Sequence, residues 1–212
     1  MDIYWYGQAC FKIKGKNATI FIDPFKPDFT GLKLPKDMEA DIALSTHDHD
    51  DHNNLEAVLS NPVKISGPGE YEAKGVSIIG IQVAHDGTGG LDRGKNTVYN
   101  IMVDGLNIVH LGDLGHKLSE DQVQEIGSTD ILMAPVGGIY TVGAKEAEEI
   151  IVQLEPKIII PMHYLIPGLK FELEGVEHFL KDMGEGSEPL PKLSITKDKL
   201  PEEPKVVVLN KS

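Results

Sequence analysis

The hydrophobic and polar positions divide the chain into two parts with different periodicities. In the first two-thirds, short runs rich in β-branched and aromatic residues alternate with Gly, Asn, Asp and Pro, a pattern typical of strands joined by turns. Asp104 and Gly105 form a hairpin signal between the last two runs. The strands predicted from this pattern span residues 2–6, 10–14, 18–22, 41–45, 63–66, 70–73, 76–84, 97–103 and 107–110.

The last third of the chain alternates between helical and strand periodicity. Apolar residues at positions 144, 147, 150, 151 and 154 lie on one helical face. The pattern predicts helices over 119–126, 144–154 and 171–183, strands over 130–134, 157–162 and 206–209, and a loop over 184–191. Helices mixed with many strands predict an α/β protein whose sheet layers are covered by helices.

Composition narrows the class of protein. The 212 residues carry a net charge of −13 and include one cysteine, Cys10, which excludes an intramolecular disulfide and a cysteine-based zinc site. No apolar run is long enough to span a bilayer. The first 15 residues lack the basic and apolar regions of a signal peptide, so we expect a cytoplasmic protein. The length of the chain is that of one domain, residues 1–212. The acidic charge disfavours nucleic acid as a partner.

The most informative segment follows the predicted strand 41–45. His47, His49, Asp51 and His52 fall within six positions, and side chains two apart on an extended chain face the same way. Imidazole and carboxylate groups together suit zinc, manganese or iron. The alternatives are a solvated polar loop or a histidine-rich tract that binds metal weakly. Three histidines and three aspartates within six positions, directly after the carboxyl end of a predicted strand, favour a metal site.

This His-x-His-x-Asp-His motif after a short apolar strand resembles the metallo-β-lactamase superfamily. Further segments resemble its branch that contains ascorbate-6-phosphate lactonase: IFIDPF, GPGEYEAKGVSI, VAHDG, HLGDLG, APVGGIYTVGAKEA and IIIPMHY. The resemblance covers nearly the whole chain. It implies a four-layered αββα sandwich with a two-metal site at one edge of its two sheets.

The resemblance also implies a role for each site residue. It assigns His47, His49 and His85 to one metal, and Asp51, His52 and His163 to the other, with Asp113 as the bridge. Asp51 and Asp113 are the expected catalytic residues. Asp23 matches an early aspartate that orients a metal ligand, and His110 is expected beside the site rather than on a metal. Gln8 departs from the family pattern, because many relatives of this branch have histidine there.

The expected activity is hydrolysis of a small ester, lactone or phosphoester by a hydroxide bridged between two divalent ions, zinc first, with manganese or iron as alternatives. Three other readings stay open: a nuclease acting on single-stranded RNA or DNA, a diiron redox protein, and a non-catalytic metal-binding module. A homo-oligomer also stays open.

Substrate selection is expected to come from loops. Residues 87–95 follow His85 and contain Arg93, the only arginine, whose planar fork of donors suits phosphate or carboxylate. A flexible loop with solvated charges is the other interpretation and the slightly favoured one, because surface loops commonly have this composition. Tyr140 is a second candidate for the substrate pocket.

Overall fold

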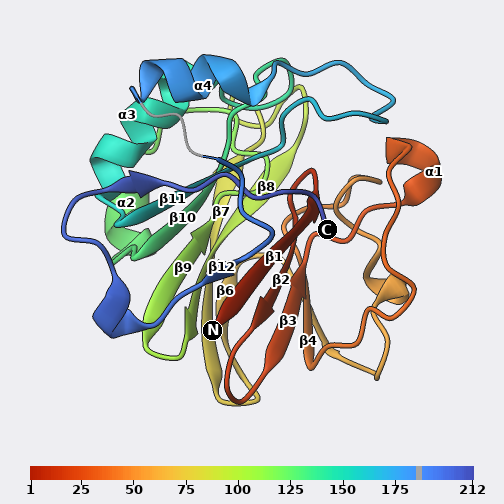
Figure 1. Ribbon diagram of the computed structural model, residues 1–212. Helices are drawn as coiled ribbons and strands as arrows, with labels where there is room; N and C mark the ends of the chain where they lie inside the picture. The colour runs from red at the N-terminus through yellow and green to blue at the C-terminus, as the bar shows by residue number, and fades with distance from the viewer. Residues whose placement is uncertain (185–187) are drawn as a thin grey trace.

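Two mixed β-sheets pack face to face in the computed structural model, which describes residues 1–184 and 188–212 (Figure 1). Part of the predicted loop 184–191 therefore lies outside the described residues. One sheet has the order β12 (Leu193–Ser194), β1 (Asp2–Gly7), β2 (Cys10–Lys14), β3 (Thr19–Ile22), β4 (Ile42–Ser45), β5 (Val63–Ser66). The other has the order β13 (Lys205–Val206), β11 (Ile158–Met162), β10 (Ile131–Pro135), β9 (Leu106–His110), β8 (Lys95–Val103), β7 (Val76–Ala84), β6 (Gly69–Ala73).

Helices cover the outer faces unequally. On the seven-stranded sheet, α2 (Glu120–Ile126) packs on β7 and β8, α3 (Ala144–Leu154) packs on β10, and α4 (Val176–Asp182) packs against α3. The outer face of the six-stranded sheet is covered by the segment between β3 and β5, whose helical parts are the short helix α1 (Pro27–Thr30) and the 3-10 turn η1 (Leu55–Ala57). A second 3-10 turn, η2, spans Lys197–Lys199 near the end of the chain. The predicted αββα class is confirmed, with one thin outer layer.

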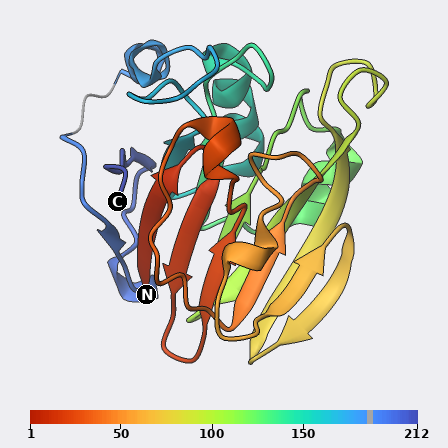
Figure 2. The same ribbon diagram turned by 90° about the vertical axis from the view of Figure 1, so that its right-hand side faces the viewer.

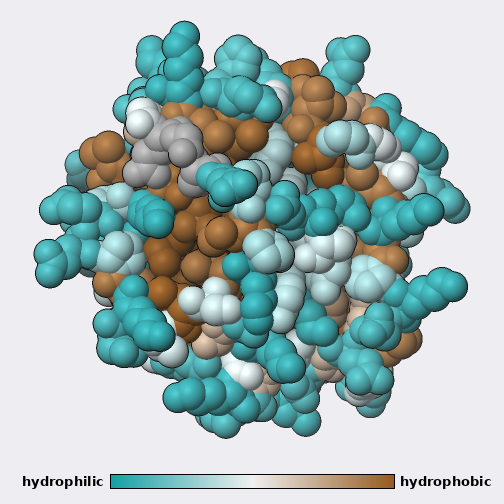
Figure 3. All heavy atoms as spheres, viewed as in Figure 1, coloured by the Kyte–Doolittle hydropathy of each residue, from teal (hydrophilic) through white to brown (hydrophobic). Residues whose placement is uncertain are grey.

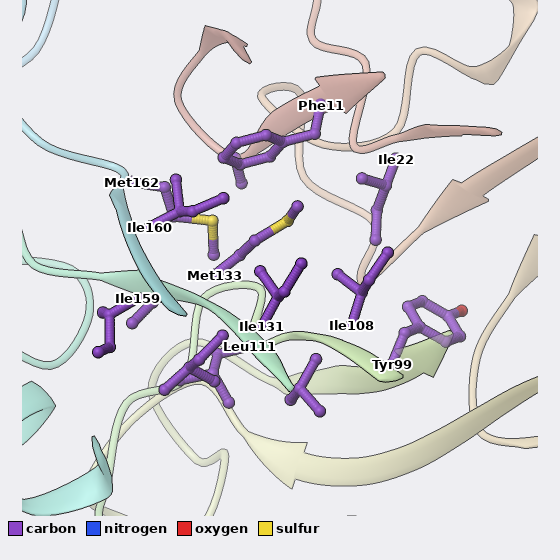
Figure 4. Packing of buried hydrophobic residues seen from close by; sticks show 14 of the residues in the cluster. Phe11, Ile22, Tyr99, Ile108, Leu111, Ile131, Met133, Ile159, Ile160 and Met162 are labelled. Atoms are coloured by element: carbon purple, nitrogen blue, oxygen red, sulfur yellow. The ribbon is translucent and has the colours of Figure 1, made fainter. Parts of the chain in front are cut away.

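The main core lies between the two sheets. Residues one apart on each strand point to opposite faces, so alternate side chains enter this layer. Figure 4 shows Phe11 and Ile22 of the six-stranded sheet facing Met133, Ile131 and Ile108 of the other, and all five are fully buried. A smaller cluster lies on the outer side of the six-stranded sheet: Tyr6, Cys10, Phe21, Phe25, Leu32, Met38, Ala40, Ala43 and Val58.

Two predicted elements are shorter than their patterns. The helix expected over 171–183 begins only at Val176, because residue 174 pairs with loops instead: Glu174 N–H donates to the Gly137 carbonyl, and its own carbonyl accepts from Leu165. The strand expected over 206–209 is reduced to β13, and β12 was not predicted.

Strand direction places several loop beginnings at one edge of the sandwich. β3 and β4 are parallel, as are β9, β10 and β11, and β7 runs in the same direction as β9 because β8 is antiparallel to both. The helix α1, which follows β3, marks this edge at the top of Figure 2. The carboxyl ends of β3 and β4 therefore lie near one another, as do those of β7, β9 and β11.

The surface carries most of the charge. Hydrophilic side chains dominate the periphery of the face in Figure 3, around an apolar patch left of its centre. Among the described residues, no helix is long and apolar enough to cross a membrane.

Candidate metal centre

The histidine and aspartate side chains of the site come from the carboxyl ends of these strands. Residues 47–52 follow β4, and His85, Asp113 and His163 follow β7, β9 and β11. Sharp backbone turns aim some of them: His163 has φ 51°, and Asp23, directly after β3, has φ 49°. This left-handed region is uncommon for residues other than glycine, and such strain gathers at functional sites.

The side chains form two adjacent groups that could each hold a metal ion. The first contains His47, His49 and His85; the second contains Asp51, His52, Asp113 and His163. Within each group the ligand atoms lie within 4.8 Å of one another. All seven residues are buried except His49, which is exposed. The structure thus brings together all seven residues that the family resemblance assigns to the metals.

Asp113 lies between the two groups. Its carboxylate faces the Nε2 atoms of four histidines: His52 at 3.2 Å from Oδ1, and His85, His163 and His47 at 3.3, 3.3 and 4.0 Å from Oδ2. His47 and His85 belong to the first group, and His52 and His163 to the second. One carboxylate therefore contacts both groups.

Asp51 occupies the second group and borders open space. Its Oδ2 lies 3.5 Å from His52 Nε2 and 3.6 Å from His163 Nε2. The same residue lines the cleft described below. A carboxylate in this position contacts both the imidazoles and any molecule that enters the cleft.

Asp23 holds the base of the site. Its Oδ2 lies 2.8 Å from His52 Nδ1, and its two oxygens accept from Thr46 N–H and Thr46 Oγ1–H, each at 2.7 Å. Thr46 Oγ1 lies 3.0 Å from His47 Nδ1. The network fixes the rings of His52 and His47 so that both Nε2 atoms point at Asp113, as outer partners of metal ligands do.

The donor set fits a metal. His52 Nε2 and Asp113 Oδ1 are buried and, although 3.2 Å apart, form no hydrogen bond with each other or with any other described residue. Buried polar atoms are costly without a partner, and a cation between them would satisfy both. With only imidazole nitrogens and carboxylate oxygens, the set suits zinc, manganese or iron.

Charges within the site shift the pKa values strongly. Burial acts to raise the pKa of Asp113, but His163 and His52 outweigh it and hold that pKa well below its ordinary value. Burial acts to lower the pKa of His52, but Asp113, Asp51 and Asp23 outweigh it and raise that pKa well above the ordinary value. Burial, reinforced by His52, lowers the pKa of His47 to about 2. Without a cation, the carboxylates therefore favour the protonated form of His52, whereas burial favours the neutral form of His47.

Gly112 allows the backbone before Asp113 to approach β8 and the end of β4. It has φ 55°, and a Cβ there would clash with Thr46, at 2.9 Å, and would come closer still to Asn96. Asn96 Oδ1 accepts from Asp113 N–H at 3.1 Å, and its amide donates to the Leu111 carbonyl at 2.8 Å. A larger residue at 112 would displace the Asp113 carboxylate.

His110 is occupied by the backbone. Its Nε2 lies 2.9 Å from the Ala9 carbonyl, and its Nδ1 accepts from Gly112 N–H at 3.1 Å. Both ring nitrogens are therefore engaged, and the ring packs edge-on against Phe11 at 5.8 Å. His110 supports the turn that carries Asp113 and offers no free nitrogen to an ion.

Gln8 belongs to the site, which the sequence reasoning missed. It is fully buried with φ 51°, and its side-chain nitrogen lies 3.4 Å from His163 Nε2. Its carbonyl accepts from His163 N–H at 3.2 Å and from Trp5 Nε1–H at 2.8 Å. The departure from the family pattern at this position was the available signal.

A cleft of about 580 Å³ opens onto the two groups. Arg93 and Tyr140, the two predicted substrate-pocket residues, both line it, together with Phe29, Lys170 and Phe171. Phe171 was counted in the predicted helix 171–183 and instead faces this cleft, since α4 begins later. The cleft therefore combines the candidate metal groups with a wall of aromatic and basic side chains.

Comparison with known proteins agrees with this geometry. Residues 2–163 match a model described as the β-lactamase superfamily domain. A crystal structure from Thermotoga maritima, described as a Zn-dependent hydrolase of the metallo-β-lactamase superfamily, is 40% identical with a TM-score of 0.81, covering 98% of this chain and 97% of that one. The UPF0173 metal-dependent hydrolase of Thermoplasma volcanium is 32% identical over 190 residues, 77% of this chain and 83% of the relative. A metallo hydrolase from Ignicoccus hospitalis, 22% identical with a TM-score of 0.65 over 86% of this chain and 90% of that one, shares the fold.

Proposed function

The chain is a metal-dependent hydrolase that belongs to the metallo-β-lactamase superfamily, and from that premise we propose that it uses two divalent ions to cleave a small ester, lactone or phosphoester. His47, His49 and His85 would hold one ion, and Asp51, His52 and His163 the other. Asp113 would serve both. Zinc is the first candidate, and manganese or iron would also suit these ligands.

One observation carries the proposal. The Asp113 carboxylate faces the Nε2 atoms of four histidines drawn from both groups, at 3.2 to 4.0 Å. A structural site for one ion would need only one of the groups, because three or four ligands suffice. A shared carboxylate between two groups supports a pair of ions that act on one substrate.

The chemistry divides between the ions and the chain. When bound, two divalent ions lower the pKa of water and polarise the carbonyl or phosphoryl oxygen that is attacked. Asp51, at the cleft surface, would accept a hydrogen bond from the attacking water and hold its proton at the free carboxylate oxygen. Asp23 would keep His52 in one orientation throughout the reaction through the 2.8 Å contact.

The proposal is tested by the metal content of the purified protein. We expect two zinc or manganese ions per chain by elemental mass spectrometry, and a fall to one or none in Asp113→Ala. The control variant is Asp121→Ala, which removes an exposed aspartate from the first turn of α2 and should keep both ions.

Turnover is then measured on a panel of ester, lactone and phosphodiester substrates. Loss of metal in Asp113→Ala together with loss of turnover would support the proposal. Metal content that is unchanged by Asp113→Ala would refute the shared carboxylate. Two irons with a redox-active spectrum and no hydrolysis would favour the diiron alternative.

A further inference from the structure

Part of the cleft lining is a row of one cation and three aromatic rings in mutual contact. The Arg93 guanidinium carbon lies 4.7 Å from the centre of the Tyr140 ring. Tyr140 meets Phe171 edge-on at 6.0 Å, and Phe171 lies 5.8 Å from Phe29. All four residues line the cleft. They come from three separate loops and α1, so the fold assembles the row.

Asp86 fixes the loop that carries Arg93. Its carboxylate accepts five hydrogen bonds from within residues 88–93: from Thr88 N–H at 2.8 Å, Thr88 Oγ1–H at 2.9 Å, Gly90 N–H at 2.7 Å, Asp92 N–H at 3.0 Å and Arg93 N–H at 2.8 Å. Asp86 directly follows His85, so the loop is tied to a candidate metal ligand. The loop is therefore an ordered element that presents Arg93 at a defined place, contrary to the flexible alternative.

The Arg93 guanidinium packs on Tyr140 but has no hydrogen-bond or ion-pair partner among the described residues. Among the described residues, no carboxylate lies within ion-pair distance of it and no acceptor receives a hydrogen bond from its side chain. By contrast, the other cation of the cleft, Lys170, donates to the Asp28 carbonyl at 2.7 Å. A guanidinium held over an aromatic face keeps its fork of donors available, and that fork matches carboxylate and phosphate oxygens.

We propose that Arg93, held on Tyr140, binds an anionic group, a carboxylate or phosphate, on the substrate away from the bond that is cleaved. The aromatic faces of Tyr140 and Phe171 accept the flat or apolar body of the same molecule. The enzyme is then selective for small anionic esters over neutral ones. The cleavage step rests on the proposed function, whereas the binding of the anion does not.

The kinetic test uses two substrates that differ only in charge, 4-acetoxybenzoate and 4-acetoxybenzamide. Water cleaves the same ester bond in both and releases acetate and the corresponding phenol. We expect wild-type protein to show a kcat/KM ratio of at least about ten in favour of the benzoate, the scale of one hydrogen-bonded charge contact. The ratio should approach one in Arg93→Leu, because the anion receptor is lost.

Conservative and control variants separate recognition from general damage. Arg93→Lys keeps the charge without the fork and should give an intermediate ratio. Tyr140→Leu should lower the ratio because the guanidinium loses its platform, whereas Tyr140→Phe should keep it. The matched control is Lys12→Leu, which removes a cation of β2 that lies outside the cleft, 5.3 Å from the Phe21 ring of β3, and should leave the ratio unchanged.

A binding test is independent of turnover. Calorimetric titration of the metal-loaded protein compares terephthalate, which has two carboxylates, with benzoate, which has one. Tighter binding of terephthalate in the wild type, lost in Arg93→Leu and kept in Lys12→Leu, supports the receptor even if no ester is cleaved. Equal kcat/KM for the two acetoxy substrates, with equal affinity for the two acids, would overturn it while leaving the hydrolase assignment intact.

Discussion

Asp23 Oδ2 and His52 Nδ1 lie 2.8 Å apart and are both fully buried, although 29 residues separate them in the chain. The contact joins the end of β3 to the loop after β4, two parallel neighbours in one sheet. It fixes the orientation of the His52 ring, so that the Nε2 atom faces Asp113. The candidate metal site is thus oriented by the sheet beneath it as well as by its own ligands.

Replacing Asp23 should weaken metal binding without removing a ligand. Asp23→Asn keeps the size of the side chain but removes the charge that supports His52, and we expect a loss of about 10- to 100-fold in metal affinity. Competition with a chromogenic chelator measures it. Asp41→Asn is the matched control, because Asp41 accepts from Thr19 N–H at 2.8 Å in the same sheet away from the site. Equal losses in both variants would contradict an orienting role for Asp23.

Metal binding should release protons at pH 7. Burial acts to lower the pKa of His52 and of His163, but the carboxylates of the site outweigh it and raise both above the ordinary value of about 6.5, which favours the protonated rings while metal is absent. Each must lose its proton to bind a cation, so affinity should fall as pH is lowered. Calorimetry of metal binding in PIPES and in Tris, whose ionisation enthalpies differ, reports the protons released.

The proton count has its own control. His178→Gln removes an exposed imidazole of α4 and should leave the difference between the two buffers unchanged. Identical heats of metal binding in PIPES and in Tris would show that no proton is displaced and would argue against protonated imidazoles in the metal-free site.

Removing the Asp86 carboxylate should loosen residues 87–94. Asp86→Ala deletes the acceptor of five hydrogen bonds, so the peptide bond after Arg93 should become accessible to trypsin. We expect cleavage there to be faster by about tenfold or more in limited proteolysis, because each lost hydrogen bond costs about 1 kcal/mol. Asp92→Ala is the control, since the Asp92 carboxylate accepts one hydrogen bond among the described residues, from Thr88 Oγ1. Similar cleavage rates in both variants would show that the Asp86 carboxylate does not hold residues 87–94 in place.

Stability should depend on the layer between the sheets. Ile108→Ala removes a fully buried side chain from this layer and should lower the free energy of unfolding by about 2–5 kcal/mol. Ile79→Ala makes the same chemical change on β7, where the side chain is 38% exposed, and should cost about 1 kcal/mol or less. Urea denaturation measures both, and comparable losses would mean that the main core lies elsewhere.

Strand periodicity and motif spacing predicted much of the fold. Strands such as β7 and β11 alternate or run continuously apolar over their whole length, and their boundaries were predicted to within one residue. The helix at 171–183 was overextended because Phe171 fits helical spacing, although loop contacts of Glu174 hold that segment away from the helix. The two-residue strand β12 pairs with β1, nearly the whole chain away in sequence, and such long-range pairing leaves no local pattern.

The sequence predicted the ligand candidates of the site and two residues that support them, Asp23 and His110, but not the supporting roles of Thr46 and Gln8. The spacing of His47, His49 and His52 and the family resemblance named the ligand candidates. The roles of Thr46 and Gln8 depend on contacts across the fold: Thr46 binds Asp23, and Gln8 approaches His163 from the turn between β1 and β2. The ordering of the Arg93 loop by Asp86 depends on loop geometry, which residue type alone does not determine.

The left-handed backbone conformations of Gln8, Asp23 and His163 lower the stability of the fold while they position side chains of the candidate site. Each position costs about 1 kcal/mol or more relative to glycine, which would adopt the same conformation without strain. Glycine would also remove the side chain that each turn presents to the site. A selection for thermal resistance alone would therefore favour changes at these positions that abolish activity, whereas natural selection keeps a protein less stable than its fold permits.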